Sequence, residues 1–261
     1  MPKKLDHTAA IMHLSSVDKK LAKIITKAGP CQLQPEKTQN IFESLMEAII
    51  YQQLHGKAAA TIAGRVKALF PENVQRITTR HGEQFGFPSP DQILAIAPER
   101  LRSAGLSQNK MLAIRDLAAK AMDGTVPTLR AARRMSDDAL VEHLTQVRGI
   151  GRWTVEMLLI FGLGRPDVLA VDDYGIRRGF AKIHGLDKLP KPKELATYGE
   201  RWRPHRSVAC WYLWRAAEMK DLPEPGAAAR AEKKAARKKG ARKVVKRRPQ
   251  TGSSRSRASR A

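Results

Sequence analysis

A short turn with two glycines, within residues 144–154, constrains the fold of this chain more than any other feature. Its pattern predicts one helix, a tight turn at Gly149 and Gly151, and a second helix that begins at once. Glycine tolerates the positive φ of such a turn and lets an anion approach the backbone closely. The N–H groups that open the second helix also favour anions, because the helix dipole is positive there. The turn, flanked by Arg148 and Arg152, is therefore a candidate phosphate-binding element.

The charge of the chain also indicates a polyanionic partner. Lys and Arg outnumber Asp and Glu by 48 to 25, a net charge of +23. Residues 226–261 hold 14 of the basic residues and a single acidic one, Glu232, which leaves +10 on residues 1–225. We expect this tail to be disordered on its own and to add sequence-independent affinity for DNA. The rest of the chain is basic as well, so the charge is not a property of the tail alone.

The body of the chain is predicted to be almost entirely helical. Apolar residues recur at helical spacing, and proline and glycine stand at the expected starts and stops. Strand signals are sparse. The helices are expected at 42–50, 58–69, 90–96, 98–104, 108–123, 137–146, 152–163, 174–184, 193–201 and 206–219.

The number of cysteines and the lengths of the apolar stretches indicate the cellular compartment of the protein. Cys31 and Cys210 are too few for a disulfide framework, and their spacing does not suit a zinc or iron–sulfur site. No apolar signal segment follows the charged N-terminus, and no apolar stretch is long enough to span a bilayer. We therefore expect a cytoplasmic protein, associated with the nucleoid, that has no membrane partner.

The residues around the glycine turn follow one another in an order typical of a known family. The turn reads Val-Arg-Gly-Ile-Gly-Arg-Trp-Thr (147–154), and a Gly/Pro loop at 162–166 leads to Asp-Val-Leu-Ala-Val-Asp-Asp-Tyr-Gly-Ile-Arg-Arg (167–178). Further matching segments lie at 47–58 and 201–209. On these motifs the chain, over roughly residues 42–219, resembles the 3-methyladenine DNA glycosylase II family of the helix-hairpin-helix (HhH-GPD) superfamily. A Gly-x-Gly turn alone would favour an ordinary helix–helix connection over a functional element.

The resemblance implies an all-α fold of two helical lobes with the hairpin at their junction. We expect residues 1–44 and 164–225 to form a terminal lobe, and residues 45–163 to form a central lobe that ends in the helix-hairpin-helix. Residues 226–261 would be the disordered basic tail. The implied partner is double-stranded DNA with alkylated bases, bound by a monomer.

The resemblance assigns catalysis to Asp173, the second of two consecutive acidic residues. Breaking an N-glycosidic bond builds positive charge on the sugar, and a carboxylate beside C1′ stabilises that charge. Taken as residues alone, Asp172 and Asp173 are also suited to cap the helix expected from Tyr174. With Asp173 catalytic, Asp172 is expected to be the cap or a supporting residue.

The tryptophans are candidates for a base-binding pocket. Aromatic faces stack on a base flipped out of the duplex and attract a cationic base. The resemblance places Trp153 and Trp214 in this pocket, with core packing as the alternative, and Met157, one turn beyond Trp153, is expected to face the same side. For Trp202 and Trp211 we expect core packing. Trp153 stands where related bifunctional enzymes carry the lysine that attacks C1′, so we expect no lyase activity.

Two segments are expected to contact DNA. The resemblance implies a minor-groove wedge among Gln53, Leu54 and His55, with a plain helix-end turn and an inward Leu54 as the alternative. At the hairpin, the candidate DNA-binding residues are Arg148, Gly149, Ile150, Gly151, Arg152 and Thr154. The family's hairpin also implies a structural monovalent cation, held by the main-chain carbonyls of Thr145, Val147 and Ile150. No other cofactor is expected, and no iron–sulfur cluster.

The function that the resemblance implies is base excision without lyase activity. The enzyme would flip out an alkylated purine, such as 3-methyladenine or 7-methylguanine, and hydrolyse its glycosidic bond to leave an abasic site. One alternative keeps the chemistry and changes the base to hypoxanthine or etheno-adenine. The other is a non-catalytic helix-hairpin-helix protein that binds DNA, for which an acidic residue beside pocket aromatics would not be needed.

Overall fold

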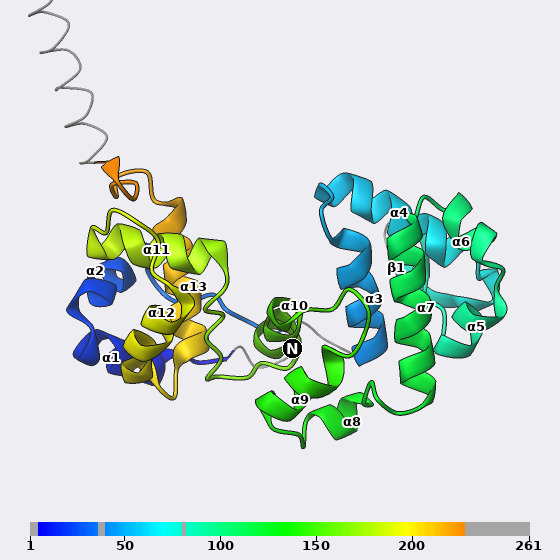
Figure 1. Ribbon diagram of the computed structural model, residues 1–261, viewed down its shortest axis with the longest axis horizontal. Helices are drawn as coiled ribbons and strands as arrows, with labels where there is room; N and C mark the ends of the chain where they lie inside the picture. Colours follow the sequence, from blue (N-terminus) through cyan, green and yellow to red (C-terminus); the bar gives the residue numbers. More distant parts are fainter. Residues whose placement is uncertain (1–4, 36–39, 80–81, 228–261) are drawn as a thin grey trace, which may run out of the picture.

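The computed structural model describes residues 5–35, 40–79 and 82–227, so most of the predicted tail, 228–261, lies outside the described residues. Its elements form two helical bodies joined around one short helix, α10, Arg152–Met157 (Figure 1). No helix in the described part of the chain is long and apolar enough to cross a membrane.

One body contains the helices nearest the two ends of the described chain. Helices α1 and α2 lie beside α11 and α13, and a single hydrophobic cluster links them (Figure 1). Trp202 is fully buried in this cluster and donates its indole N–H to Asp18 Oδ2 at 3.0 Å, which confirms its expected core role. The elements of this body are α1 (Thr8–Val17), α2 (Lys19–Ala28), α11 (Tyr174–His184), α12 (Pro192–Gly199), a 3₁₀ turn (Glu200–Trp202) and α13 (Arg206–Glu218).

The other body contains the middle of the chain. Helix α7 is its longest helix and packs against both α3 and α5. The elements are α3 (Ile41–Tyr51), α4 (Gly56–Ala68), a 3₁₀ turn (Pro71–Asn73), β1 (Val74–Thr79), β2 (Gly82–Phe85), α5 (Pro90–Ala95), α6 (Pro98–Ser103), α7 (Gln108–Met122), α8 (Leu129–Ala132) and α9 (Asp137–Leu144).

The two hydrophobic cores meet at a few side chains. The central cluster begins with Leu33 and includes Ile41 and Phe42, so these three pack with the central body although the expected terminal lobe ran to residue 44. Met157 and Trp214 are half-buried and pack against both clusters. Cys31 and Trp211 also pack against both clusters, so the junction combines two expected pocket residues with two side chains that were not expected there.

The all-α prediction is confirmed, with one small addition. Strands β1 and β2 form an antiparallel hairpin, with Val74 opposite Phe85 and Thr79 opposite Gly82. The sparse strand signals had not predicted it. Helices α1, α2 and α8 were not predicted either, although α2 buries Leu21, Ile24 and Ile25 at helical spacing behind an Asp18 cap.

The helix after the hairpin differs from its prediction. A continuous helix was expected over 152–163, but α10 ends at Met157 and a π-helical turn, Leu158–Gly162, continues it. The N–H of Leu163 donates to the carbonyl of Leu158 at 2.9 Å, five residues back. Such wider turns occur often beside functional sites, and this one contributes Leu158 and Phe161 to the main cavity.

Candidate active site

Asp173 lies at the first turn of α11 and is 9% exposed. Its Oδ1 accepts the backbone N–H of Ile176 at 2.8 Å, so Asp173 itself is the N-cap of the helix. The expectation that Asp172 is the cap is wrong, because the Asp173 side chain already holds that position and Asp172 is exposed. The cap fixes one face of the Asp173 carboxylate by a local hydrogen bond.

Two tryptophans on different helices donate hydrogen bonds to the Asp173 carboxylate. Trp153 on α10 donates its Nε1–H to Oδ2 at 2.8 Å, and Trp214 on α13 donates its Nε1–H to Oδ1 at 2.9 Å. Hydrogen bonds to a carboxylate are short and directional. Three N–H donors from three helices therefore fix both oxygens of one buried carboxylate at the junction of the two bodies.

Gly175 makes the approach of Trp214 to Asp173 sterically feasible. A Cβ at this position would lie 2.9 Å from Trp214 Cδ1 and 3.1 Å from Asp173 Oδ1. The first distance is shorter than carbon atoms tolerate without a shift of one neighbour. Sequence reasoning did not single out Gly175, although it lies within the quoted motif at 167–178.

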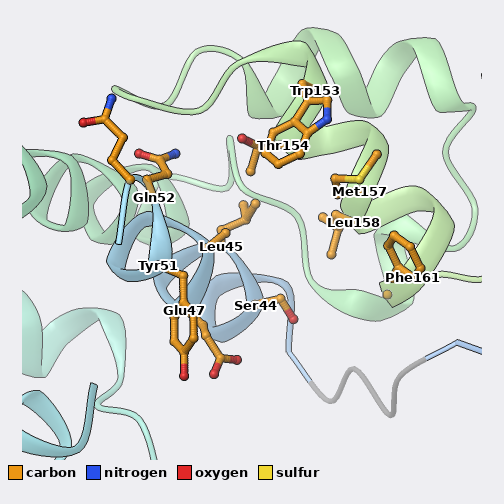
Figure 2. A pocket seen from close by; sticks show the side chains of 13 residues that line it. Ser44, Leu45, Glu47, Tyr51, Gln52, Trp153, Thr154, Met157, Leu158 and Phe161 are labelled. Carbon is orange, nitrogen blue, oxygen red and sulfur yellow. The ribbon is translucent and has the colours of Figure 1, made fainter. Parts of the chain in front are cut away.

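A cavity of about 750 Å³ opens between α3 and the α10 region (Figure 2). Trp153, 47% exposed, and Met157 lie in one wall, as expected for a base pocket. Trp214 is not part of the lining. It stacks on Phe161, with ring centroids 5.6 Å apart and planes 25° apart, and so supports a ring that does line the cavity.

The opposite wall comes from α3, which sequence reasoning did not include in the pocket. Ser44, Leu45, Glu47 and Tyr51 of this helix line the cavity, and Figure 2 shows Leu45 pointing toward the side on which Trp153 and Met157 lie. Their segment belongs partly to the matching stretch at 47–58, which was the available signal. The full lining is Ser44, Leu45, Glu47, Ala48, Tyr51, Gln52, Gln53, Trp153, Thr154, Met157, Leu158, Phe161 and Gly162.

A second carboxylate, Glu156, lies buried one turn along α10 from Arg152. It is 3% exposed, and its Oε1 accepts the Arg152 Nε–H at 2.9 Å. Its other oxygen, Oε2, has no hydrogen-bond partner among the described residues. Burial raises the pKa of Glu156, the ion pair with Arg152 opposes that rise, and the charges of Asp172 and Asp173 add to it. Arg152, a candidate DNA contact, thus already neutralises a buried acid.

The hairpin has the predicted tight turn, although only one of its two glycines, Gly149, has a positive φ. Gly149 has φ +79, and Gly151 is the N-cap of α10. Arg148, Gly149, Gly151 and Arg152 are exposed, whereas Ile150 and Thr154 are buried. The exposed members of the candidate set can contact a ligand directly, and Thr154 faces the cavity instead.

The proposed cation site stays a prediction. The Val147 carbonyl accepts the Ile150 N–H at 3.0 Å. The described hydrogen bonds include no donor to the carbonyls of Thr145 or Ile150. Two carbonyls that accept no described hydrogen bond, next to one that accepts a single hydrogen bond, suit a weakly bound hard cation.

The candidate wedge residues lie on an exposed turn between α3 and α4. Gln53 has φ +58, the one positive φ of a non-glycine residue in the described chain. Leu54 is 39% exposed and is not packed inward. His55 precedes α4 as its N-cap residue, and its side chain makes no cap hydrogen bond. All three residues are exposed, and Gln53 also lines the cavity, so the turn adjoins it.

Comparison with known proteins shows the family of this chain. Residues 46–204 match the family model described as HhH-GPD superfamily base excision DNA repair protein. The chain is 37% identical to DNA-3-methyladenine glycosylase 1 of Schizosaccharomyces pombe, over 84% of this chain and 91% of that protein. It is 30% identical to DNA-3-methyladenine glycosylase 2 of Escherichia coli, over 66% of this chain and 56% of that protein.

Solved structures show the same fold. The S. pombe 3-methyladenine DNA glycosylase in complex with abasic DNA superposes with a TM-score of 0.67 at 35% identity, covering 83% of this chain and all of that one. A DNA-3-methyladenine glycosidase from Bacillus halodurans gives a TM-score of 0.70 at 33% identity, covering 82% of this chain and 92% of that one. The chain belongs to the HhH-GPD superfamily of base excision DNA repair proteins.

Proposed function

We propose that this protein is a monofunctional DNA glycosylase that removes alkylated purines, such as 3-methyladenine and 7-methylguanine, from double-stranded DNA. The observation that carries the proposal is the Asp173 carboxylate, held by the indole N–H groups of Trp153 and Trp214. Trp153 also forms part of the wall of an aromatic cavity. A base stacked in that cavity would bring its sugar toward the carboxylate.

In this mechanism Asp173 acts by charge. As the bond between C1′ and the base lengthens, positive charge develops on the sugar, and a fixed carboxylate stabilises it. The three N–H donors hold the oxygens in place before the reaction, so little reorganisation is needed when the charge appears. Water then adds to C1′ and loses a proton to solvent, and the products are the neutral free base and an abasic site.

The residues lining the cavity suit a cationic leaving group. N3- and N7-alkylated purines carry positive charge, so they leave without protonation by a general acid. No histidine or lysine is among the described residues that line the cavity. This supports hydrolysis over a lyase reaction, which needs an amine nucleophile. Aromatic faces and the Glu47 carboxylate would favour a cationic base over a neutral one.

DNA would be held at two places by a monomer working in the cytoplasm. The exposed hairpin, with Arg148 and Arg152, would bind phosphates, and the turn at 53–55 would enter the minor groove. The S. pombe relative has been solved with abasic DNA, which supports a DNA partner for this chain. We also propose that the carbonyls of Thr145, Val147 and Ile150 hold a monovalent cation at the hairpin.

The substitution Asp173→Asn tests the proposal. It keeps the size of the side chain but removes the charge that stabilises the sugar cation. We expect release of 7-methylguanine and 3-methyladenine from alkylated DNA to fall by at least about 10²-fold. Binding to DNA that contains an abasic-site analogue should persist, as measured by fluorescence anisotropy.

Three controls separate the alternatives. A wild-type protein that releases no base from alkylated DNA but binds it tightly would indicate a non-catalytic DNA-binding protein. Duplexes with a single hypoxanthine or etheno-adenine would show whether neutral lesions are preferred. Borohydride trapping of a covalent enzyme–DNA adduct would contradict the absence of lyase activity, because only a Schiff base is reduced in this way.

A further inference from the structure

Lys110, near the start of α7, holds the end of α3 by two hydrogen bonds. Its half-buried ammonium group donates to the carbonyl of Ile50 at 2.6 Å and to the carbonyl of Gln52 at 2.7 Å. Carbonyls at a helix C-terminus lack partners and carry the negative end of the helix dipole. The Lys110 charge therefore neutralises the end of α3 at the point where the exposed turn begins.

The turn that follows adopts a backbone conformation that needs support. Residues 52–55, the wedge loop, include Gln53 with φ +58. Residues other than glycine adopt positive φ uncommonly, and such conformations persist where the surrounding structure holds them. Lys110 is bonded to the residue directly before Gln53, so it holds the loop at its base.

The wedge loop is also tied to the hairpin, residues 147–151. The side-chain amide of Gln52 donates to the carbonyl of Gly149 at 3.0 Å. This bond joins segments 97 residues apart in sequence. The carbonyl of Gly149 is at the exposed tip of the hairpin, so the two segments expected to contact DNA are joined directly.

Helix α7 contacts the hairpin one and two turns beyond Lys110. Asp116 Oδ2 accepts the backbone N–H of Arg148 at 2.7 Å, and Lys120 donates to the other Asp116 oxygen at 2.7 Å. Ala113 packs under Gly149, where an added Cβ would lie 3.5 Å from the Ala113 Cβ. Residues 110, 113 and 116 lie on one broad face of the helix.

We propose that α7 sets the spacing between the wedge loop and the hairpin, and that Lys110 is a positioning residue for base flipping. The inference rests on the proposed function and deepens it. Lys110 acts through the wedge loop and does not itself touch the base or the sugar. Two further side chains fix this spacing. Asp116 of α7 bonds the hairpin, and Gln52 joins the wedge loop to the hairpin.

Fixed spacing matters because the two DNA contacts must be made together. The hairpin grips phosphates while the wedge fills the space that the flipped nucleotide leaves. If the wedge loop shifts while the hairpin still binds the phosphates, the protein still binds DNA. The flipped-out nucleotide, however, is no longer stabilised by the wedge. A displacement of about 1 Å in such a positioning element can lower a rate by about 10²-fold.

The test compares a paired lesion with one that is already unpaired. Lys110→Met keeps an apolar stem of similar length and removes the ammonium group. In single-turnover reactions on a duplex with 7-methylguanine opposite cytosine, we expect the rate to fall by about 10- to 10²-fold. On the same duplex with an abasic analogue opposite the lesion, where extrusion costs less, the loss should be less than about threefold.

Matched variants separate positioning from simple loss of charge or fold. Lys110→Arg should restore most of the paired-lesion rate, because its guanidinium can also donate to both carbonyls. Lys23→Met, at an exposed position on α2, removes one positive charge and should leave both rates unchanged. If Lys110→Met is unstable in thermal melts, Gln52→Ala supplies the test, with the same preferential loss on the paired lesion.

Two results would overturn the inference: equal losses on the paired and unpaired lesions, or no loss on either. A 2-aminopurine beside the lesion reports unstacking and should show weaker extrusion in Lys110→Met at saturating protein. Failure of the proposed function looks different, because the wild-type protein would then release no base from either duplex. Asp173→Asn provides the reference for loss of chemistry on both substrates.

Discussion

Gly175 sets how closely Trp214 can approach the catalytic candidate Asp173. Gly175→Ala places a methyl group 2.9 Å from Trp214 Cδ1 and 3.1 Å from Asp173 Oδ1, so one of the two must move. We expect the single-turnover rate of base release to fall by about 10- to 10²-fold, since a small misplacement of a catalytic group is costly. Affinity for abasic-analogue DNA should stay near that of the wild type.

Gly64→Ala is the matched control for this prediction. Gly64 is exposed on α4, and a Cβ there meets nothing within 4 Å. Its rate should equal that of the wild type, and its melting temperature should be equal or higher, because alanine favours helix. An unchanged rate in Gly175→Ala would mean that the bond between Trp214 and Asp173 has no part in catalysis.

At the scale of residues the sequence indicated a candidate catalytic residue but not the side chains that surround it. The order of the motif pointed to Asp173, and its role as helix cap was a local alternative that could be stated in advance. Asp173, the expected catalytic residue, is itself the helix cap, which the choice between Asp172 and Asp173 did not anticipate. The indole donors come from α10 and α13, 20 and 41 residues away, so only tertiary packing brings them to the carboxylate.

Several helices of this fold end against a basic side chain from another element. Lys110 holds the end of α3, and Arg115 donates to the carbonyls of Ile93 and Ile96 around the end of α5. Lys182, with a buried side chain, donates to the carbonyls of Ala217 and Met219 at the end of α13. Cationic groups stabilise the negative end of the helix dipole. These contacts therefore add a favourable electrostatic interaction where one element packs against another.

The Lys182 contact predicts a pH dependence of stability. Hydrogen bonds from Arg178 and Lys182 lower the pKa of Glu224 from 4.5 to about 2. A depressed pKa in the folded state stabilises the protein above about pH 4.5, and this contribution is lost as the pH falls toward 2. We expect Glu224→Gln to lower the melting temperature at neutral pH, with the difference from wild type shrinking below pH 4.5.

Glu218→Gln is the control, because it removes an exposed carboxylate at the end of α13, the helix that precedes Glu224 in the chain. A difference between Glu224→Gln and wild type that stays constant down to pH 2 would contradict the link to Glu224 ionisation. Thermal melts followed by circular dichroism at several pH values provide the measurement. Glu224 is solvent-accessible, so added salt should weaken the effect.

Most of the longer helices were predicted from apolar periodicity and marked boundaries, although α2, which has both signals, was missed. Helix α11 was predicted at its observed bounds, with Asp173 before it and Gly185 after it. The β-hairpin and the π-helical turn at Leu158–Gly162 were not predictable in this way. A π turn depends on one extra residue accommodated by packing on both sides, and helical periodicity alone does not reveal it.

At the scale of the whole molecule, the basic residues of the tail are expected to affect DNA affinity, whereas base release is expected to depend on the candidate active site. Residues 228–261 contain 14 Lys or Arg and one Glu, whereas the candidate active site lies among the described residues. Each phosphate that a tail residue neutralises adds about 0.9 to the magnitude of the slope of log K against log salt. Deleting 228–261 should therefore weaken binding to undamaged duplex and flatten this slope by several units.

Base release at saturating protein should be unchanged in the same truncated protein, because the deletion leaves Asp173, Trp153 and Trp214 in place. The two measurements are a salt titration of binding by anisotropy and a single-turnover rate at high protein concentration. An unchanged salt slope would mean that the +10 net charge of residues 1–225 already provides the phosphate contacts. A fall in the saturated rate would instead mean that the tail helps to hold the lesion at Asp173, which sequence-independent attraction cannot do.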